Sequence, residues 1–245
     1  MKLDQYSLLK EKLISDKHSS IFILVDDNTD KFCLNIFKEK SGIKKFNKII
    51  IKSGEENKNI ESCLYIWDQL NEFNADRKSL LINLGGGVLT DMGGFCASTY
   101  LRGISFINIP TTLLGMVDAA HGGKTGIDFK QLKNQIGVFK DPLEVILDSD
   151  YLKTLSKDEF INGYAECLAK ISSYNEIKEE IEKCLQELDY SGINVNFQKV
   201  TGILEDCGYE DCNQGLVDII SRVKLVLCKI SYEMNKYKKK ILHFY

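Results

Sequence analysis

Short apolar runs, separated by polar and glycine-rich segments, dominate the first 110 residues of the chain. Four runs rich in isoleucine, leucine and valine are typical of buried strands, and they cover residues 20–25, 48–51, 80–84 and 104–109. Residues 60–73 carry apolar side chains at helical spacing and predict an amphipathic helix. This alternation of strand and helix predicts a parallel sheet with crossover helices.

The pattern changes beyond about residue 155, where the strand signals fade. Helical spacing continues over residues 157–170, 175–189 and 213–237. We therefore expect an α/β Rossmann-like domain over residues 1–155, followed by an all-helical domain over residues 156–245. Residues 4–15 also carry leucines and an isoleucine at helical spacing, which predicts a helix before the first strand.

Three polar or glycine-rich segments follow predicted strands. They are DDNT at 26–29, GGG at 85–87 and PTT at 110–112. Asp and Asn after a strand predict a turn at DDNT. Because ligands bind at the carboxyl ends of parallel strands, these segments predict a binding site along one edge of the sheet.

Residues 85–137 hold eleven of the eighteen glycines and one of the two prolines. Glycine tolerates positive φ and has no Cβ, so this density predicts backbone that turns sharply or lies against a ligand. Among the charged and amide side chains of the same block are Asp91, Arg102, Asp118, Lys124, Lys133 and Asn134. Bare backbone amides beside fixed charges suit an anionic, phosphate-bearing ligand.

Single motifs in this block leave alternatives open. Asp91 could accept hydrogen bonds from a ribose or hold its own loop, and GGG does not follow the GxGxxG pattern of dinucleotide sites. Thr111 and Thr112 could donate to a nucleotide or cap the next helix. Lys124 follows two glycines, a position from which a lysine reaches a phosphate oxygen. Lys133 could act in the same way.

Composition excludes several classes of protein. The formal charge is −3 over 245 residues, and mixed acids and bases argue against nucleic-acid or basic membrane-surface binding. No apolar run has the length of a membrane span, and the N-terminal residues lack the apolar region of a signal peptide. Eight cysteines without a CxxC pair predict reduced thiols in the cytoplasm.

The motifs GGGVLTD, TYLRG, PTTLL, VDAAHGGKTGI and KNQIG resemble, in order and spacing, those of the 3-dehydroquinate synthases. SGEENK at 53–58, YLKTL at 151–155 and GYAE at 163–166 match the same family. Polyol dehydrogenases of related fold share the GGG…D turn but lack GGKTG and KNQIG. The resemblance runs from about Asp26 to Glu166.

This resemblance implies a reaction and a set of ligands. The family converts 3-deoxy-arabino-heptulosonate 7-phosphate, a sugar phosphate, to 3-dehydroquinate and orthophosphate in the shikimate pathway, using tightly held NAD. The implied NAD contacts are Asp26, Asn28, Ser53, Gly54, Glu55, Glu56, Asn57, Lys58, Gly87, Val88, Leu89, Thr90, Asp91, Thr111, Thr112, Lys124, Lys133, Tyr151, Leu152, Lys153 and Thr154. Arg102, Asp118, Lys124, Lys133 and Asn134 would address NAD or the substrate phosphate and carboxylate.

The resemblance also implies a catalytic zinc or cobalt ion, for which Glu166 matches the glutamate ligand. Two histidine ligands complete the family's site, the first in a GHT motif, and no histidine of this chain lies in such a motif. Further departures are Ala169 in place of a lysine, Ala120 and His121 in the VDAAHGG segment, and Lys239 in place of an arginine.

From these departures we expect a chain that is truncated within the helical domain. One interpretation is an enzyme completed by a partner, either a complementing C-terminal fragment or a second copy in a homodimer. Another is a non-catalytic remnant that still binds NAD. Less favoured interpretations are another sugar-phosphate cyclase, such as a 2-deoxy-scyllo-inosose or 2-epi-5-epi-valiolone synthase, and a polyol dehydrogenase.

Overall fold

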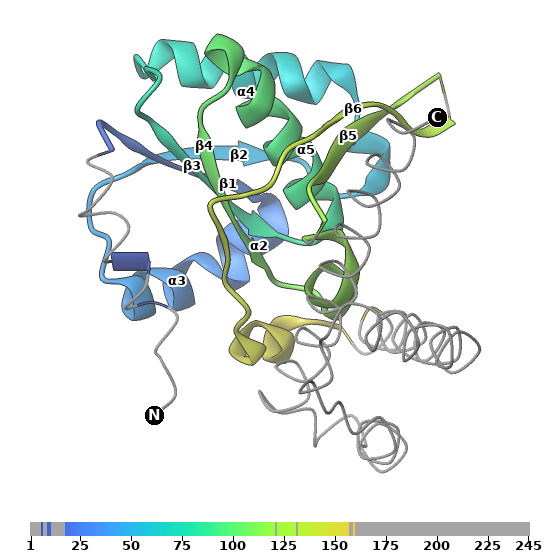
Figure 1. The fold of residues 1–245 in the computed structure, drawn as a ribbon. Coiled ribbons are helices and arrows are strands. Elements are labelled where there is room, and N and C mark those ends of the chain that lie inside the picture. Colours follow the sequence, from blue (N-terminus) through green and yellow to red (C-terminus); the bar gives the residue numbers. More distant parts are fainter. Residues whose placement is uncertain are drawn as a thin grey trace, which may run out of the picture. The chain divides into compact units, whose positions relative to one another are not determined.

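Five parallel strands form the centre of the described unit (Figure 1). In sheet order they are β2 (Asn47–Ile51), β1 (Ile21–Asp26), β3 (Leu80–Gly85), β4 (Ser105–Pro110) and β7 (Glu144–Val145). The computed structural model describes residues 6, 9–10, 18–120, 122–130, 132–156 and 159, all within the unit Met1–Phe160. The predicted parallel sheet is confirmed, and the two-residue β7 is too short to have produced a sequence signal.

Helices cover both faces of this sheet. In Figure 1, α4 (Ile60–Glu72) and α5 (Gly87–Thr99) lie on one side, and α2 (Asp27–Phe32) and α3 (Leu34–Ser41) lie on the other. The core between the sheet and the α4–α5 pair is apolar, and it includes Phe22, Leu24, Ile49, Leu81 and Phe106 from the strands and Ile66, Leu70 and Met92 from the helices. Each such side chain contributes about 1.5–3 kcal/mol by leaving water.

The turn predicted at DDNT is wrong, because this segment begins helix α2. The Asp26 carboxylate accepts a hydrogen bond from Thr29 N at 2.7 Å, and Asp26 N donates to Thr29 Oγ1 at 2.9 Å. This reciprocal pairing is a capping box, which satisfies amides that a helix start would otherwise leave unpaired. Aspartate favours helix caps as well as turns, so the residue type alone did not decide between them.

Two adjacent glycines place α5 between the sheet and a β-hairpin. A Cβ on Gly93 would lie 2.1 Å from Asn83 Oδ1 of β3, and one on Gly94 would lie 2.5 Å from Thr125 Cγ2. Thr125 belongs to β5 (Lys124–Phe129), which pairs antiparallel with β6 (Leu132–Phe139). Larger residues at either glycine would separate layers that now touch.

The hairpin was not predicted from the sequence. Gly126 and Gly137 face each other across it, and a Cβ on Gly137 would lie 2.2 Å from Thr125 O. These two glycines therefore allow close approach of two strands. Gly122 and Gly123, in contrast, have φ of 83° and 64° and form the turn expected before Lys124.

Four short helical turns complete the described unit, namely η1 (Glu55–Asn57), η2 (Tyr100–Arg102), the π-helix η3 (Gly115–Ala119) and η4 (Ser149–Thr154). No helix among the described residues is long and apolar enough to cross a membrane. The helices expected beyond residue 156, and most of the one expected over 4–15, lie outside the described residues. The domain boundary near 155 stays a prediction.

We predict that Gly94→Ala destabilises the protein by about 1–2 kcal/mol, because the added methyl group overlaps Thr125 Cγ2. Thr125→Ser removes that methyl group and keeps the hydroxyl that donates to Val138 O. Urea unfolding of both single variants and the double variant measures the effect. The double variant should lose less stability than the sum of the singles, and strict additivity would contradict this packing.

Candidate functional site

The N-terminus of α5 meets the end of β3 at three consecutive glycines. Gly86 is the N-cap and, being a glycine, offers no side chain to cap this helix start. A Cβ on Gly86 would lie 3.0 Å from Thr112 Cγ2, and one on Gly87 would lie 3.0 Å from Ala119 Cβ. The side chains of Thr112 and Ala119 therefore pack closely against the backbone of these glycines. Amides at the start of a 13-residue helix, with the helix dipole behind them, favour an anion.

The end of β4 closes one side of this helix start. Pro110 pairs with Gly85 in the sheet, and Thr111 N donates to Gly85 O at 3.1 Å. The Thr111 side chain is buried. Thr112 Oγ1 accepts a hydrogen bond from Gly115 N at 3.0 Å, so this hydroxyl caps the following turn. Of the two roles open for Thr112, the structure therefore shows the cap.

Asp27 connects the start of α2 with the loop after β2. Its carboxylate accepts hydrogen bonds from Ser53 N at 3.0 Å and from Asn28 N at 3.1 Å. The bonds from Ser53 hold the pKa of Asp27 below its usual range. Gly54 then takes a φ of 108°, which a side chain rarely allows. The predicted contacts Asp26 and Asn28, at the start of α2, are therefore connected to Ser53 on the loop after β2.

A buried lysine, Lys58, connects the loop after β2 (the β2 loop) with α5 and with the hairpin through hydrogen bonds. Lys58 is 4% exposed, and its Nζ donates to Asp91 Oδ2 at 2.7 Å and to Asn134 Oδ1 at 2.7 Å. The Lys58 carbonyl oxygen also accepts from Asp128 N on β5 at 2.9 Å. Three of the residues predicted to bind ligands are thereby brought together by one ammonium group.

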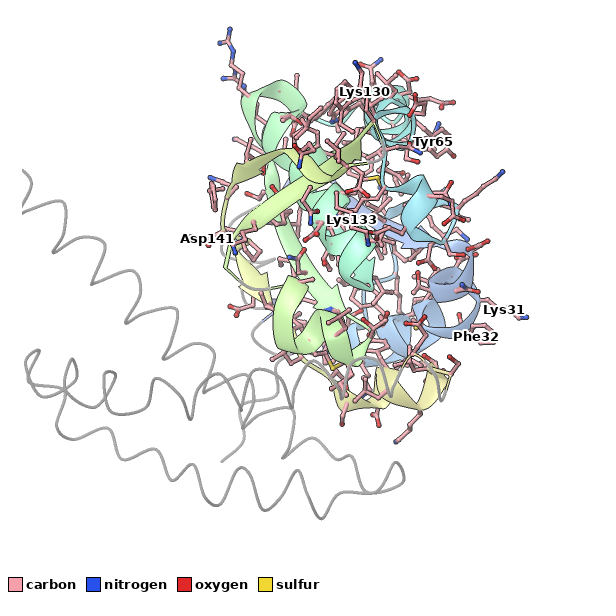
Figure 2. The ribbon with its side chains drawn as sticks, turned by 90° about the vertical axis from the view of Figure 1, so that its right-hand side faces the viewer. Lys31, Phe32, Tyr65, Lys130, Lys133 and Asp141 are labelled. Atoms are coloured by element: carbon pink, nitrogen blue, oxygen red, sulfur yellow. The ribbon has the colours of Figure 1, made fainter. Side chains whose placement is uncertain are left out.

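Lys133 lies beside this group on the hairpin face that Figure 2 shows. Its Nζ lies 2.9 Å from Glu55 Oε1, with side chains 71% and 41% exposed. The hydrogen bond to Glu55 raises the pKa of Lys133. A pair this exposed contributes little stability, so both groups can exchange partners with a ligand. Lys124 is also exposed, at the start of β5.

Arg102 lies apart from this group. It follows the C-terminal end of α5, whereas Gly87 begins that helix, and 12 intervals of helical rise place the two ends about 18 Å apart. Asp118 falls in η3, next to the end of β4. The structure therefore gathers Lys58, Asp91, Lys133 and Asn134 but leaves Arg102 at the opposite end of α5.

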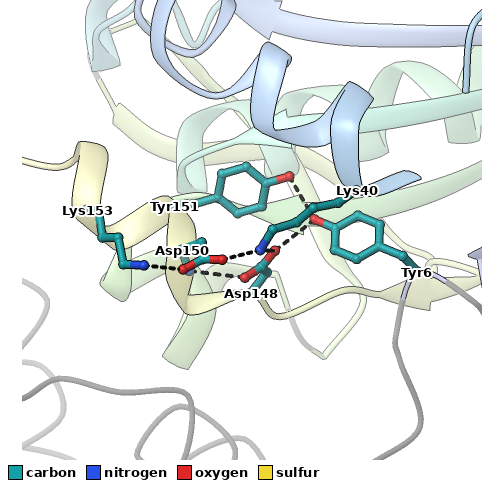
Figure 3. A network of polar contacts seen from close by, with 6 residues as sticks. All are labelled: Tyr6, Lys40, Asp148, Asp150, Tyr151 and Lys153. Carbon is teal, nitrogen blue, oxygen red and sulfur yellow. Dashed lines mark hydrogen bonds and ion pairs between the residues drawn. The ribbon is translucent and has the colours of Figure 1, made fainter. Parts of the chain in front are cut away.

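The YLKT run forms η4 and belongs to a polar network with the N-terminal segment and α3 (Figure 3). Tyr6 donates to Asp148 Oδ2 at 3.1 Å and lies 2.8 Å from the Tyr151 hydroxyl. Lys40 bridges Asp148, at 2.6 Å, and Asp150. Burial raises the pKa of Tyr6 and of Tyr151, so both hydroxyls stay protonated and can donate.

Several predicted cofactor contacts have buried side chains. Besides Lys58 and Thr111, they are Leu89, Thr90, Tyr151 and Leu152. Thr154 Oγ1 donates to Tyr151 O at 2.7 Å and lies 3.4 Å from Cys33 Sγ. Sequence reasoning did not identify Tyr6, Lys40, Asp128, Asp148 or Asp150. Their roles depend on contacts between distant segments, and only the carboxylate of Asp128, close to KNQIG, offered a local signal.

A metal ligand was predicted at Glu166, which lies outside the described residues, as do the helices predicted around it. Within the described ranges, no three His, Cys, Asp or Glu side chains are grouped so that they could hold a metal ion. The metal ligand at Glu166 therefore stays a prediction.

Comparison with known proteins agrees with these features. Residues 48–162 match the 3-dehydroquinate synthase N-terminal family. The chain is 43% identical over 193 residues to the 3-dehydroquinate synthase of Parabacteroides distasonis, covering 78% of this chain and 55% of that protein. The chain is a relative of the 3-dehydroquinate synthases. The Clostridium acetobutylicum enzyme is 42% identical over 183 residues, covering 72% of this chain and 50% of that enzyme.

Solved structures show the same fold. A Streptomyces hygroscopicus 2-epi-5-epi-valiolone synthase with NAD+ and Zn2+ bound aligns with a TM-score of 0.63 at 25% identity, over 91% of this chain and 58% of that one. A 2-deoxy-scyllo-inosose synthase complexed with carbaglucose-6-phosphate, NAD+ and Co2+ aligns with a TM-score of 0.61 at 21% identity, over 66% and 46%. The chain spans about half the length of the curated 3-dehydroquinate synthases it matches.

We predict that Lys58→Met destabilises the protein by about 3 kcal/mol, because it leaves Asp91 and Asn134 without their shared donor. Lys48→Met is the matched control, since Lys48 forms an ion pair with Asp30 that is much more exposed and should contribute less than about 1 kcal/mol. Urea unfolding compares the two. Equal losses would contradict the role given to Lys58.

We also predict a dependence of stability on pH from Asp150. Its hydrogen bonds with Lys153 and Lys40 hold the pKa of Asp150 below its usual range. The folded state therefore gains stability from this carboxylate above about pH 4 and loses it as the pH falls further. In Asp150→Asn, the melting temperature should fall less steeply than in the wild-type chain as the pH is lowered below about 4. Asp141 is an exposed aspartate outside the network, and Asp141→Asn should leave this pH dependence unchanged.

Proposed function

We propose that this chain supplies the NAD- and phosphate-binding half of a 3-dehydroquinate synthase. The substrate would be 3-deoxy-arabino-heptulosonate 7-phosphate, and the products 3-dehydroquinate and orthophosphate. The observation that carries the proposal is the meeting of the α5 N-terminus, the β2 loop and the hairpin at Lys58, within the residues that the family model matches. Among the described residues, Cys33, Cys63 and Cys96 are free and buried, which accords with a reducing cytoplasm.

The residues at the sheet edge fit a dinucleotide. The Gly86 N-cap has no capping side chain, and a Cβ added at Gly86 or Gly87 would lie 3.0 Å from Thr112 or Ala119, so bare backbone suits an anion here. When bound, NAD supplies the acceptor and later the donor of a hydride. We propose that Asp26, Asn28 and the Ser53–Lys58 loop hold its nucleoside portions. Leu89, Thr90, Tyr151 and Leu152, being buried, would act through their backbone.

Cations beside the hairpin suit the departure of phosphate. Lys124 and Lys133 are both exposed, and neither charge is buried against a fixed partner. Positive charge stabilises the negative charge that develops on a leaving phosphate. Asn134 offers an amide that now accepts from Lys58. By resemblance, Glu166 would be a ligand of the zinc or cobalt ion.

Other sugar-phosphate cyclases are the second candidate, favoured by the likeness to the 2-epi-5-epi-valiolone synthase structure. Likeness to an iron-containing alcohol dehydrogenase of Thermotoga maritima, with a TM-score of 0.59 at 14% identity, reflects the fold alone. A cyclase returns its hydride to the product, whereas a dehydrogenase accumulates NADH. This difference separates the two classes.

The test is orthophosphate release from 3-deoxy-arabino-heptulosonate 7-phosphate by the purified chain with NAD+ and Zn2+ or Co2+. Release together with 3-dehydroquinate supports the proposal. Saturable NAD+ binding without release supports a non-catalytic NAD-binding protein, and release from another sugar phosphate alone supports a different cyclase. Gel filtration during the assay detects the partners expected from the sequence, a second copy or a complementing fragment.

We predict that Lys124→Met weakens binding of the sugar phosphate by about tenfold or more, since a hydrogen bond to a charged group contributes about 1.5–3 kcal/mol. Lys130→Met, at the hairpin tip, is the matched control and should leave affinity within about twofold (Figure 2). Calorimetric titration measures both, and thermal unfolding verifies that each variant is folded. Equal affinities of the two variants would exclude Lys124 from the site.

A further inference from the structure

The hairpin carries a bulge at the two residues predicted to contact the substrate. Its strands pair Ile127 with Ile136 and Phe129 with Leu132, with a shift of register between these pairs. One residue, Asp128, lies between them on β5, whereas residues 133–135 lie between them on β6. Two extra residues therefore bulge from β6, and bulges of this kind redirect side chains near binding sites.

Asp128 fixes this bulge from the opposite strand. Its Oδ1 accepts a hydrogen bond from Asn134 N at 2.7 Å, while its own N donates to Lys58 O at 2.9 Å. Asn134 has a φ of 55°, in the left-handed region, which is unfavourable for a residue with a side chain. A charge-assisted hydrogen bond to the Asn134 amide compensates for that conformation.

The bulge determines where both side chains lie. Asn134 Oδ1 faces Lys58 Nζ at 2.7 Å, and Lys133 Nζ faces Glu55 Oε1 at 2.9 Å. A regular strand would alternate these side chains between its two faces. Here both reach the β2 loop, so the conformation held by Asp128 brings a cation and an amide to the same place.

We propose that Asp128 is a positioning residue for Lys133 and Asn134. Its carboxylate closes the β6 bulge and so presents both side chains to the phosphate-bearing ligand, without touching that ligand itself. The ligand rests on the function proposed above, whereas the effect on the bulge does not. The two parts can therefore be tested separately.

The first measurement is amide hydrogen exchange at Asn134, compared between the wild-type chain, Asp128→Ala and Asp128→Asn. Loss of the carboxylate acceptor should speed exchange at Asn134 by about tenfold or more in Asp128→Ala. Asp128→Asn retains an oxygen acceptor and should stay within about threefold of wild type. Asp141→Ala is the control for loss of an exposed aspartate. If Asp128→Ala does not fold, Asp128→Ser, whose hydroxyl is too short to reach Asn134 N, replaces it.

The second measurement is the dissociation constant for 3-deoxy-arabino-heptulosonate 7-phosphate in the same variants. We expect it to rise about tenfold in Asp128→Ala and to be largely restored in Asp128→Asn. Unchanged exchange at Asn134 in Asp128→Ala, or equal damage in both variants, would overturn the inference. If the wild-type chain does not bind the sugar phosphate while Asn134 exchange responds as expected, the proposed ligand fails and the role of Asp128 in the bulge stands.

Discussion

The proposed site depends on the two hydrogen bonds that the Lys58 ammonium group donates. This group is buried, so its charge must be matched by fixed partners, and these are Asp91 of α5 and Asn134 of β6. The partners lie 33 and 76 residues away along the chain. Since a buried charge without them would be strongly unfavourable, the β2 loop, the start of α5 and the hairpin must fold as one unit.

Close packing around α5 makes this arrangement possible. Gly93 lets the helix approach Asn83 and Leu24 of the sheet, and Gly94 lets the hairpin approach from the other side. The hairpin strands in turn touch at Gly126 and Gly137. Asp91 therefore lies within reach of both Lys58 and the hairpin only because four glycines in this block carry no side chain. Part of the glycine density thus serves packing, and another part, at Gly86 and Gly87, forms the start of α5 where we propose that an anion binds.

Sequence patterns predicted the sheet because its strands are continuous apolar runs and α4 has one apolar face. They did not predict the hairpin, whose apolar residues are interrupted by glycines and by the bulge at Lys133–Gln135. The motifs predicted Lys58, Asp91 and Asn134 as ligand contacts, but not that they contact one another. The contacts of Tyr6 join segments distant in sequence, which no local pattern encodes, whereas Asp128 lies six residues before Asn134 but between the recognised motifs. Residues beyond 159 carry the predicted metal ligand Glu166, which stays a prediction.

The central claim is that the loops joined at Lys58 form one nucleotide-binding edge. Calorimetric titration of NAD+ into the purified chain tests it most directly. The account predicts saturable binding of one NAD+ per chain that weakens as salt screens the exposed lysines. Absence of saturable binding up to millimolar NAD+, in a chain shown to be folded by cooperative urea unfolding, would contradict it.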